Sequence, residues 1–127
     1  MSAMTIKDLR ATKGQRTLAY VQVASEEEAV AASQAGMDMI GTAFVPERAS
    51  WARSVPGTHF QYGLPWGHHA DATEALRDAM GAMRAGAQSV YCGYSPKIVE
   101  ALAREGVPVI CHVGLVPPKA TWTGGFK

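Results

Sequence analysis

The chain has 127 residues, of which 47% are hydrophobic and 18% charged, and its formal net charge is +1. This composition is typical of one globular domain with an apolar core and excludes a disordered tail. The near-neutral charge argues against nucleic acid as a partner. Because the sequence has no apolar run of about 18 residues and no charged-then-apolar leader, we expect neither membrane insertion nor secretion and predict a cytoplasmic protein.

The hydrophobic pattern alternates between helices and strands along the chain. A short helix is predicted at 5–10, with Thr5 as N-cap and Asp8 three residues later. Runs of apolar and β-branched residues predict five strands, at 17–23, 38–44, 58–64, 89–94 and 107–113. Further helices are predicted at 25–36, 71–86 and 95–106, whereas 45–57 loses the periodicity and is expected to be a long loop, with room for one helical turn.

A weak internal repeat supports this assignment. Three helices end at a glycine that is followed by a short run into a strand, at Gly36, Gly86 and Gly106. This repeated βα order predicts a parallel sheet, either open and doubly wound or part of an eight-stranded barrel. No glycine-rich phosphate loop follows the first strand, and the acidic run 26–28 would repel a phosphate there.

The last predicted strand, 107–113, is mostly apolar and β-branched, and we expect it to be buried on both faces. His112 interrupts this run near its C-terminal end, where parallel α/β folds place their chemistry. Cys92 and Cys111 fall within predicted strands without CxxC spacing, so we expect reduced thiols and no zinc site.

The stretch 106–117 reads GVPVICHVGLVP and is followed by GGFK at 124–127. Together they resemble the GIPVxGHxGLTPQ…GGYK signature of the ketopantoate hydroxymethyltransferase family. The resemblance extends back without gaps to Asp71, and the segments 35–40 and 61–66 resemble two further strand ends of the family. Only 45–57 is much shorter than the corresponding family segment.

The resemblance implies an α/β fold of the (β/α)8 TIM-barrel type, in the phosphoenolpyruvate-utilising superfamily. The chain would then supply about five of the eight βα units, as a single domain over 1–127 that forms the N-terminal part of the barrel. Such an incomplete barrel leaves two sheet edges open, so we expect a C-terminal portion, a homo-oligomer or a second chain to cover them.

The resemblance also implies a reaction, the transfer of a hydroxymethyl group from methylene-tetrahydrofolate to the 2-oxo acid 3-methyl-2-oxobutanoate, as a step towards pantothenate. The family uses Mg²⁺, a hard cation that takes oxygen ligands. The family's acids fall near Ala43 and Phe44, on Gly63 and on Gly93, and its substrate lysine falls on Tyr91. We therefore predict no metal ligands in this chain.

His112 is the predicted catalytic residue, because an imidazole at a strand end can bind a carbonyl or carboxylate or act as acid and base. A buried, hydrogen-bonded core histidine is the alternative. The residues predicted to bind substrate are Thr42, Gln61, Tyr91, Cys92 and Lys127. Cys92 also fits a small core residue. His68, His69 and Asp71 resemble a metal cluster, but capping of the following helix accounts for Asp71.

Three functional hypotheses follow. The first is the family reaction on a small 2-oxo acid. The second is a diverged carbon–carbon lyase or aldolase of the same superfamily that works on a small oxo acid without Mg²⁺. The third is a non-catalytic relative or subunit that binds a metabolite or completes another chain's barrel. Dependence of activity on a bound metal would separate the first hypothesis from the others.

Overall fold

The computed structural model describes residues 2–125, which form a five-stranded parallel sheet with helices between successive strands. The strands are β1 (Tyr20–Gln22), β2 (Met39–Ala43), β3 (His59–Gly63), β4 (Ser89–Cys92) and β5 (Val109–Cys111). The α-helices are α1 (Ile6–Ala11), α2 (Glu26–Gln34), α3 (Trp51–Ser54), α4 (Ala72–Arg84), α5 (Pro96–Arg104) and α6 (Ala120–Thr123). Two 3₁₀ turns, η1 (Pro46–Arg48) and η2 (Pro117–Lys119), complete the elements. None of the helices in this described part is long and apolar enough to cross a bilayer.

The helix starts follow the capping residues of the sequence. Thr5 and Asp8 form a reciprocal capping box at α1, and Asp71 accepts a hydrogen bond from the backbone N–H of Glu74 at α4. Ser95 occupies the N-cap position of α5, but its side chain makes no capping hydrogen bond. Pro96, at the first helical position, lacks the N–H group and fixes φ near the helical value, which favours a helix start without a side-chain cap.

The strands pair in the order in which they occur along the chain, from β1 to β5, and every pairing is parallel. This confirms the predicted α/β class and the parallel sheet. Within residues 2–125, β1 and β5 each pair on one side only. The eight-stranded barrel stays a prediction, because the described strands do not close on themselves.

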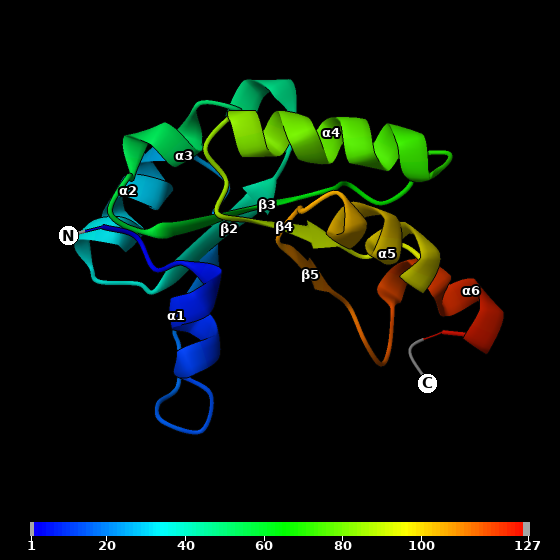
Figure 1. The fold of residues 1–127 in the computed structure, drawn as a ribbon, viewed down its shortest axis with the longest axis horizontal. Coiled ribbons are helices and arrows are strands. Elements are labelled where there is room, and N and C mark those ends of the chain that lie inside the picture. The colour runs from blue at the N-terminus through cyan, green and yellow to red at the C-terminus, as the bar shows by residue number, and fades with distance from the viewer. Residues whose placement is uncertain (1, 126–127) are drawn as a thin grey trace.

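One face of the sheet is covered by helices, and Figure 1 shows α2, α3 and α4 along one side of the strands, with α1 on the other side. Three alanines of α4, at 75, 79 and 82, are fully buried, which lets the helix approach the sheet closely. The fully buried strand residues on this face are Ile40, Phe60, Tyr62, Val90 and Cys92. The Tyr62 hydroxyl donates to the Arg48 carbonyl and accepts from the Ala52 N–H, which fixes the 45–57 segment as short helical turns.

The expectation that the last strand is buried on both faces is wrong. β5 spans only Val109–Cys111; Val109 and Ile110 are half-buried, and Cys111 is exposed. Val113, within the predicted strand, is 84% exposed. The reason is that β5 is an edge strand of the described sheet, so one side of it lacks a neighbour.

The opposite face of the sheet is polar. We call it the polar face and define it by the residues that alternate with the core residues along β1–β5, together with His112, which follows β5. They are Tyr20, Gln22, Met39, Gly41, Ala43, His59, Gln61, Gly63, Ser89, Tyr91, Ile110 and His112. His59, Gln61 and Ser89 are buried, so their polar atoms need partners.

His59 and Ser89 provide those partners at the N-terminal end of this face. His59 Nδ1 lies 2.7 Å from the carbonyl oxygen of Met4, and Nε2 lies 2.7 Å from Ser89 Oγ. Because a carbonyl only accepts, Nδ1 carries the hydrogen, and in the neutral ring Nε2 accepts from the Ser89 hydroxyl. Burial lowers the pKa of His59, although its hydrogen bond to Met4 partly opposes this effect. The pair thus ties the segment before α1 to the sheet.

Tyr20 crosses β2 on the same face. Its hydroxyl donates to Gln61 Oε1 on β3 at 3.2 Å, two strands away. A Cβ atom at Gly41 would lie only 2.1 Å from the Tyr20 hydroxyl oxygen. Gly41 therefore makes room for the tyrosine to reach across its strand.

Acidification should destabilise the protein through His59. Because its folded-state pKa is lowered from the ordinary value of 6.5, the unfolded chain takes up the proton first. The free energy of unfolding should therefore be fully retained above that value and fall as pH drops below it. Urea denaturation at several pH values between about 8 and 5 measures this slope. His59→Gln should remove most of it, whereas His68→Gln, at an exposed histidine, should leave it unchanged; a slope unaffected by His59→Gln contradicts the assignment.

Gly41→Ala should displace the Tyr20 ring. We expect a loss of about 1 kcal/mol in the free energy of unfolding, the cost of a modest steric clash that a flexible side chain relieves. In a Tyr20→Ala background the same substitution should cost less than about 0.5 kcal/mol, because the clashing atoms are gone. Equal costs in the two backgrounds, measured by chemical denaturation, would refute the contact.

Candidate functional site

A pocket of about 150 Å³ lies at the C-terminal ends of the strands. Parallel α/β folds place their ligand sites at this end, where the loops after the strands can shape the site. The pocket is lined by Tyr20, Gln22, Thr42, Ala43, Gln61, Gly63, Leu64, Pro65 and Tyr91. All of these side chains are uncharged, and the polar ones carry only hydroxyl and amide groups. The pocket can therefore offer hydrogen bonds without a fixed formal charge.

Gln61 lies at the centre of this arrangement and is buried, with 5% of its surface exposed. Its Oε1 accepts from Tyr20, and its Nε2 donates to Ser89 Oγ at a long 3.5 Å. Ser89 in turn donates to His59. The amide orientation is thus fixed by groups on both sides, which leaves Gln61 preorganised at the wall of the pocket.

Tyr91 and His112 form the second polar unit of the site. The Tyr91 hydroxyl oxygen lies 2.7 Å from His112 Nδ1, and His112 Nε2 bonds to the carbonyl of Leu115. Burial raises the pKa of Tyr91, so the phenol is held in its neutral form. Tyr91 lines the pocket, whereas the half-buried His112, which follows the end of β5, does not.

Thr42 reaches the pocket from β2 but is held from the other side. Its hydroxyl donates to the Val23 carbonyl at 2.9 Å and accepts from the Arg48 guanidinium at 2.8 Å. Arg48 also lies over the ring of Trp51, 5.2 Å from the ring centroid. Arg48 is therefore a cation next to the rim of the pocket that is not among its lining residues.

The structure brings together four of the predicted site residues: Gln61, Tyr91, Thr42 and, hydrogen-bonded to Tyr91, His112. Cys92 lies apart from them, fully buried on the helix-covered face, and burial raises the pKa of its thiol. It therefore packs as a small core side chain in the described structure. Lys127 lies outside the described residues.

Tyr20, Ser89 and the pairing of His59 were not predicted from the sequence. The signal lay in the alternation of side chains along each strand. In β3, His59, Gln61 and Gly63 fall on one face, and in β4 Ser89 and Tyr91 fall on the same face of the sheet. Tyr20, Ser89 and His59 lie before the C-terminal ends of their strands, so a search limited to residues at the strand ends does not find them.

The polar face does not fit a divalent cation of the Mg²⁺ type. Such a cation takes carboxylate and other oxygen ligands, and the pocket lining includes no aspartate or glutamate. Across residues 2–125, no three His, Cys, Asp or Glu side chains gather as a metal site would need. Two carboxylates in the chain after β3 have other partners, since Asp71 caps α4 and Asp78 bonds to His69 Nε2 at 2.6 Å.

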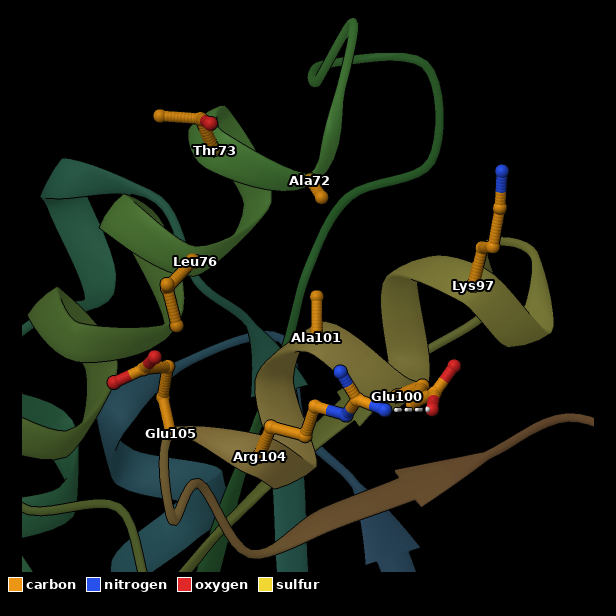
Figure 2. Close-up of a pocket in the computed structure, with 8 residues that line it drawn as sticks. All are labelled: Ala72, Thr73, Leu76, Lys97, Glu100, Ala101, Arg104 and Glu105. Atoms are coloured by element: carbon orange, nitrogen blue, oxygen red, sulfur yellow. Dashed lines mark ion pairs between the residues drawn. The ribbon is translucent and has the colours of Figure 1, made fainter.

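A larger pocket lies elsewhere, on the outer surface between α4 and α5. Figure 2 shows its walls, with Lys97, Glu100 and Arg104 on one side and the start of α4 on the other. The Arg104 guanidinium pairs with Glu100 at 3.0 Å, one turn away on the same helix. Its lining residues belong to α4 and α5 or directly follow α5, and none comes from a strand end.

Comparison with known proteins identifies the relatives of this chain. The sequence profile of the ketopantoate hydroxymethyltransferase family matches residues 42–127, from the end of β2 onwards. A 3-methyl-2-oxobutanoate hydroxymethyltransferase of Chromohalobacter salexigens is 43% identical over 79 residues, which are 60% of this chain and 30% of that protein. One from Deinococcus radiodurans is 40% identical over 81 residues, 59% of this chain and 28% of that protein.

A third relative extends the likeness to nearly the whole chain. The Thermus thermophilus protein of the same name is 32% identical over 147 aligned positions, covering 97% of this chain and 56% of that protein. The chain therefore spans about half the length of this relative, and its matches to the first two cover less than a third of each. The matched region includes Gln61, Tyr91 and His112. On the extent of the profile match, the chain belongs to the ketopantoate hydroxymethyltransferase family.

Proposed function

We propose that the strand-end pocket binds a small 2-oxo acid and that the protein takes part in hydroxymethyl transfer to it. The observation that carries this proposal is the position of the pocket. It lies at the C-terminal ends of parallel strands, where polar groups converge from β1, β2, β3 and β4, and its lining residues from Thr42 onwards fall within the region that matches the family. The relatives are named for 3-methyl-2-oxobutanoate, and we propose this compound as the acceptor.

The pocket residues would act as hydrogen-bonding groups. Gln61 can donate from its amide nitrogen to a carbonyl oxygen of the ligand, and the Tyr20 hydroxyl, which donates to Gln61 Oε1, holds the amide in that orientation. Donors fixed before the ligand arrives stabilise an oxygen that gains negative charge during reaction, at little cost of reorganisation. Arg48, bonded to Thr42 at the rim, supplies positive charge that favours an anionic ligand.

The family resemblance implies methylene-tetrahydrofolate as the one-carbon donor and Mg²⁺ as the metal. We retain the folate as part of the proposal. The uncharged lining of the pocket does not fit Mg²⁺, and none of the proposed roles of Gln61, Tyr20 and Arg48 involves a metal.

The same uncharged lining favours a second candidate, a metal-independent lyase or aldolase on a small oxo acid. A non-catalytic metabolite-binding subunit is the third. An activity assay with 3-methyl-2-oxobutanoate and methylene-tetrahydrofolate, run with and without a chelator, separates the three. Transfer that stops on chelation supports the family reaction with its metal, transfer or cleavage that persists supports metal-independent chemistry, and ligand binding without turnover supports the subunit.

We also propose that the open side of β5 is covered in the working protein, by further strands in a homo-oligomer or in a second chain. Val113, Leu115 and Trp122, which follow β5, are 84%, 46% and 89% exposed. An apolar groove beside the strand, between it and α1, includes Leu9, Val107 and Ile110. Exposed apolar side chains next to an unpaired strand edge are typical of an interface and a hazard otherwise.

Removal of the pocket's polar groups should weaken ligand binding. We expect Tyr20→Phe and Gln61→Met each to raise the Kd for 3-methyl-2-oxobutanoate by about three- to tenfold, since a hydrogen bond contributes about 0.5–1.5 kcal/mol. Isothermal titration calorimetry measures the change. Gln15→Met, in an exposed turn, is the matched control and should bind normally. Unchanged affinity in both pocket variants would place the ligand elsewhere.

A charge on the apolar surface after β5 should disrupt the proposed assembly that covers the open side of this strand. We expect Val113→Asp to lower the mass measured by light scattering on a sizing column, because burying an unpaired carboxylate in an interface is costly. Thr17→Asp, at another exposed position, should leave the mass unchanged. A wild-type protein of single-chain mass would refute assembly from separate chains.

A further inference from the structure

The hydrogen positions at His112 can be deduced from its partners. His112 Nε2 contacts the carbonyl oxygen of Leu115, which can only accept, so Nε2 carries a hydrogen. In a neutral imidazole the other nitrogen, Nδ1, is then bare and accepts. The Tyr91 hydroxyl, 2.7 Å away, must donate to it. The phenol hydrogen is therefore engaged with His112 Nδ1, and the phenol oxygen can accept a further hydrogen bond.

Both nitrogens of His112 are thus occupied within the protein. His112 is not among the lining residues of the pocket, whereas Tyr91 is. We propose that Tyr91 is the group that meets the bound ligand, and that His112 is a positioning residue that acts through Tyr91. This inference rests on the proposed function, and it revises the sequence-based prediction that His112 itself is catalytic.

The resting arrangement is set to accept a proton from a ligand hydroxyl. The ligand O–H bond breaks, and its proton passes to the Tyr91 oxygen while the ligand oxygen keeps the electron pair. The proton of Tyr91 passes at the same time to His112 Nδ1, which becomes an imidazolium. In the direction of hydroxymethyl transfer, water would supply the new oxygen by releasing the methylene group of the donor as formaldehyde. Addition of the oxo acid's enolate to that C=O bond leaves an alkoxide, and the step run backwards protonates it. No phenolate forms, in keeping with the pKa of Tyr91, which burial raises.

This arrangement predicts which ligand the dyad recognises. The lone pairs of Tyr91 can accept from the hydroxyl of ketopantoate, the hydroxymethylated 2-oxo acid, but have no donor to meet in 3-methyl-2-oxobutanoate. A pocket that hydrogen-bonds a hydroxyl discriminates against a ligand that lacks it. Tyr91 therefore contacts the hydroxyl that is present only in the product, whereas Gln61, oriented by Tyr20, contacts the oxo acid that is common to both ligands.

Calorimetric titration with both ligands tests the proposal. Tyr91→Phe, which keeps the ring and removes only the hydroxyl, should raise the Kd for ketopantoate about tenfold and that for 3-methyl-2-oxobutanoate less than about twofold. An equal loss for both ligands, or no loss for ketopantoate, overturns the assignment of Tyr91.

A double-mutant cycle tests whether His112 acts through Tyr91. His112→Ala should weaken ketopantoate binding in the native background and have no further effect in the Tyr91→Phe background. His112→Asn should restore part of the affinity, because its amide oxygen can accept from Tyr91 as Nδ1 does. If His112→Ala costs the same in both backgrounds, His112 meets the ligand directly and the proposal fails.

NMR of protein labelled with nitrogen-15 at its histidines tests the Tyr91–His112 hydrogen bond without any ligand. We expect His112 to carry its hydrogen on Nε2, and Tyr91→Phe to shift the Nδ1 resonance. A hydrogen on Nδ1 overturns the dyad as described. If neither 2-oxo acid binds the native protein, the proposed function fails and the role of Tyr91 towards a ligand fails with it, while the NMR arm still decides the direction of the Tyr91–His112 hydrogen bond.

Discussion

The polar face depends on one constraint, that every buried hydrogen-bonding group has a partner. A directed chain meets it: Tyr20 donates to Gln61, Gln61 to Ser89, Ser89 to His59, and His59 to the carbonyl of Met4. Within residues 2–125, each buried side-chain nitrogen and oxygen has a hydrogen-bond partner. This series of hydrogen bonds links β1, β3, β4 and the segment before α1. A change at Met4 or His59 should therefore alter the orientation of the groups at the pocket.

The residues in this series of hydrogen bonds are uncharged, and this determines which ligands the pocket can bind. A metal-binding face would need carboxylates, whose mutual repulsion only the cation would offset. Hydroxyl, amide and imidazole groups satisfy one another without a cation, and burial holds His59 and Tyr91 in their neutral forms. On our proposal, the pocket would recognise its ligand by the direction of its hydrogen bonds, and would distinguish a ligand with a hydroxyl from one without.

The sequence predicted the strands, most helix caps and the parallel order, because these follow from local periodicity and capping chemistry. It did not predict the links between Tyr20 and Gln61 or between Tyr91 and His112, because cross-strand contacts depend on register, which one sequence does not reveal. The environment of β5 was misjudged for another reason. An apolar composition indicates that a strand can be buried, but it does not show whether neighbours are present. Within the described residues, β5 has a neighbouring strand on one side only.

That mismatch at β5 bears directly on Tyr91 and His112. His112 lies between Cys111 and Val113, both exposed, and its bond to Leu115 is made within the same segment. A chain segment that covers the apolar residues after β5 would exclude water from this hydrogen bond and from the Tyr91 bond. Because hydrogen bonds strengthen as the local dielectric constant falls, completion of the sheet edge would tighten the dyad without touching the ligand. On the two proposals together, assembly and proton transfer would be coupled through the same short segment, and a variant that weakens the assembly should also weaken the preference for a hydroxylated ligand.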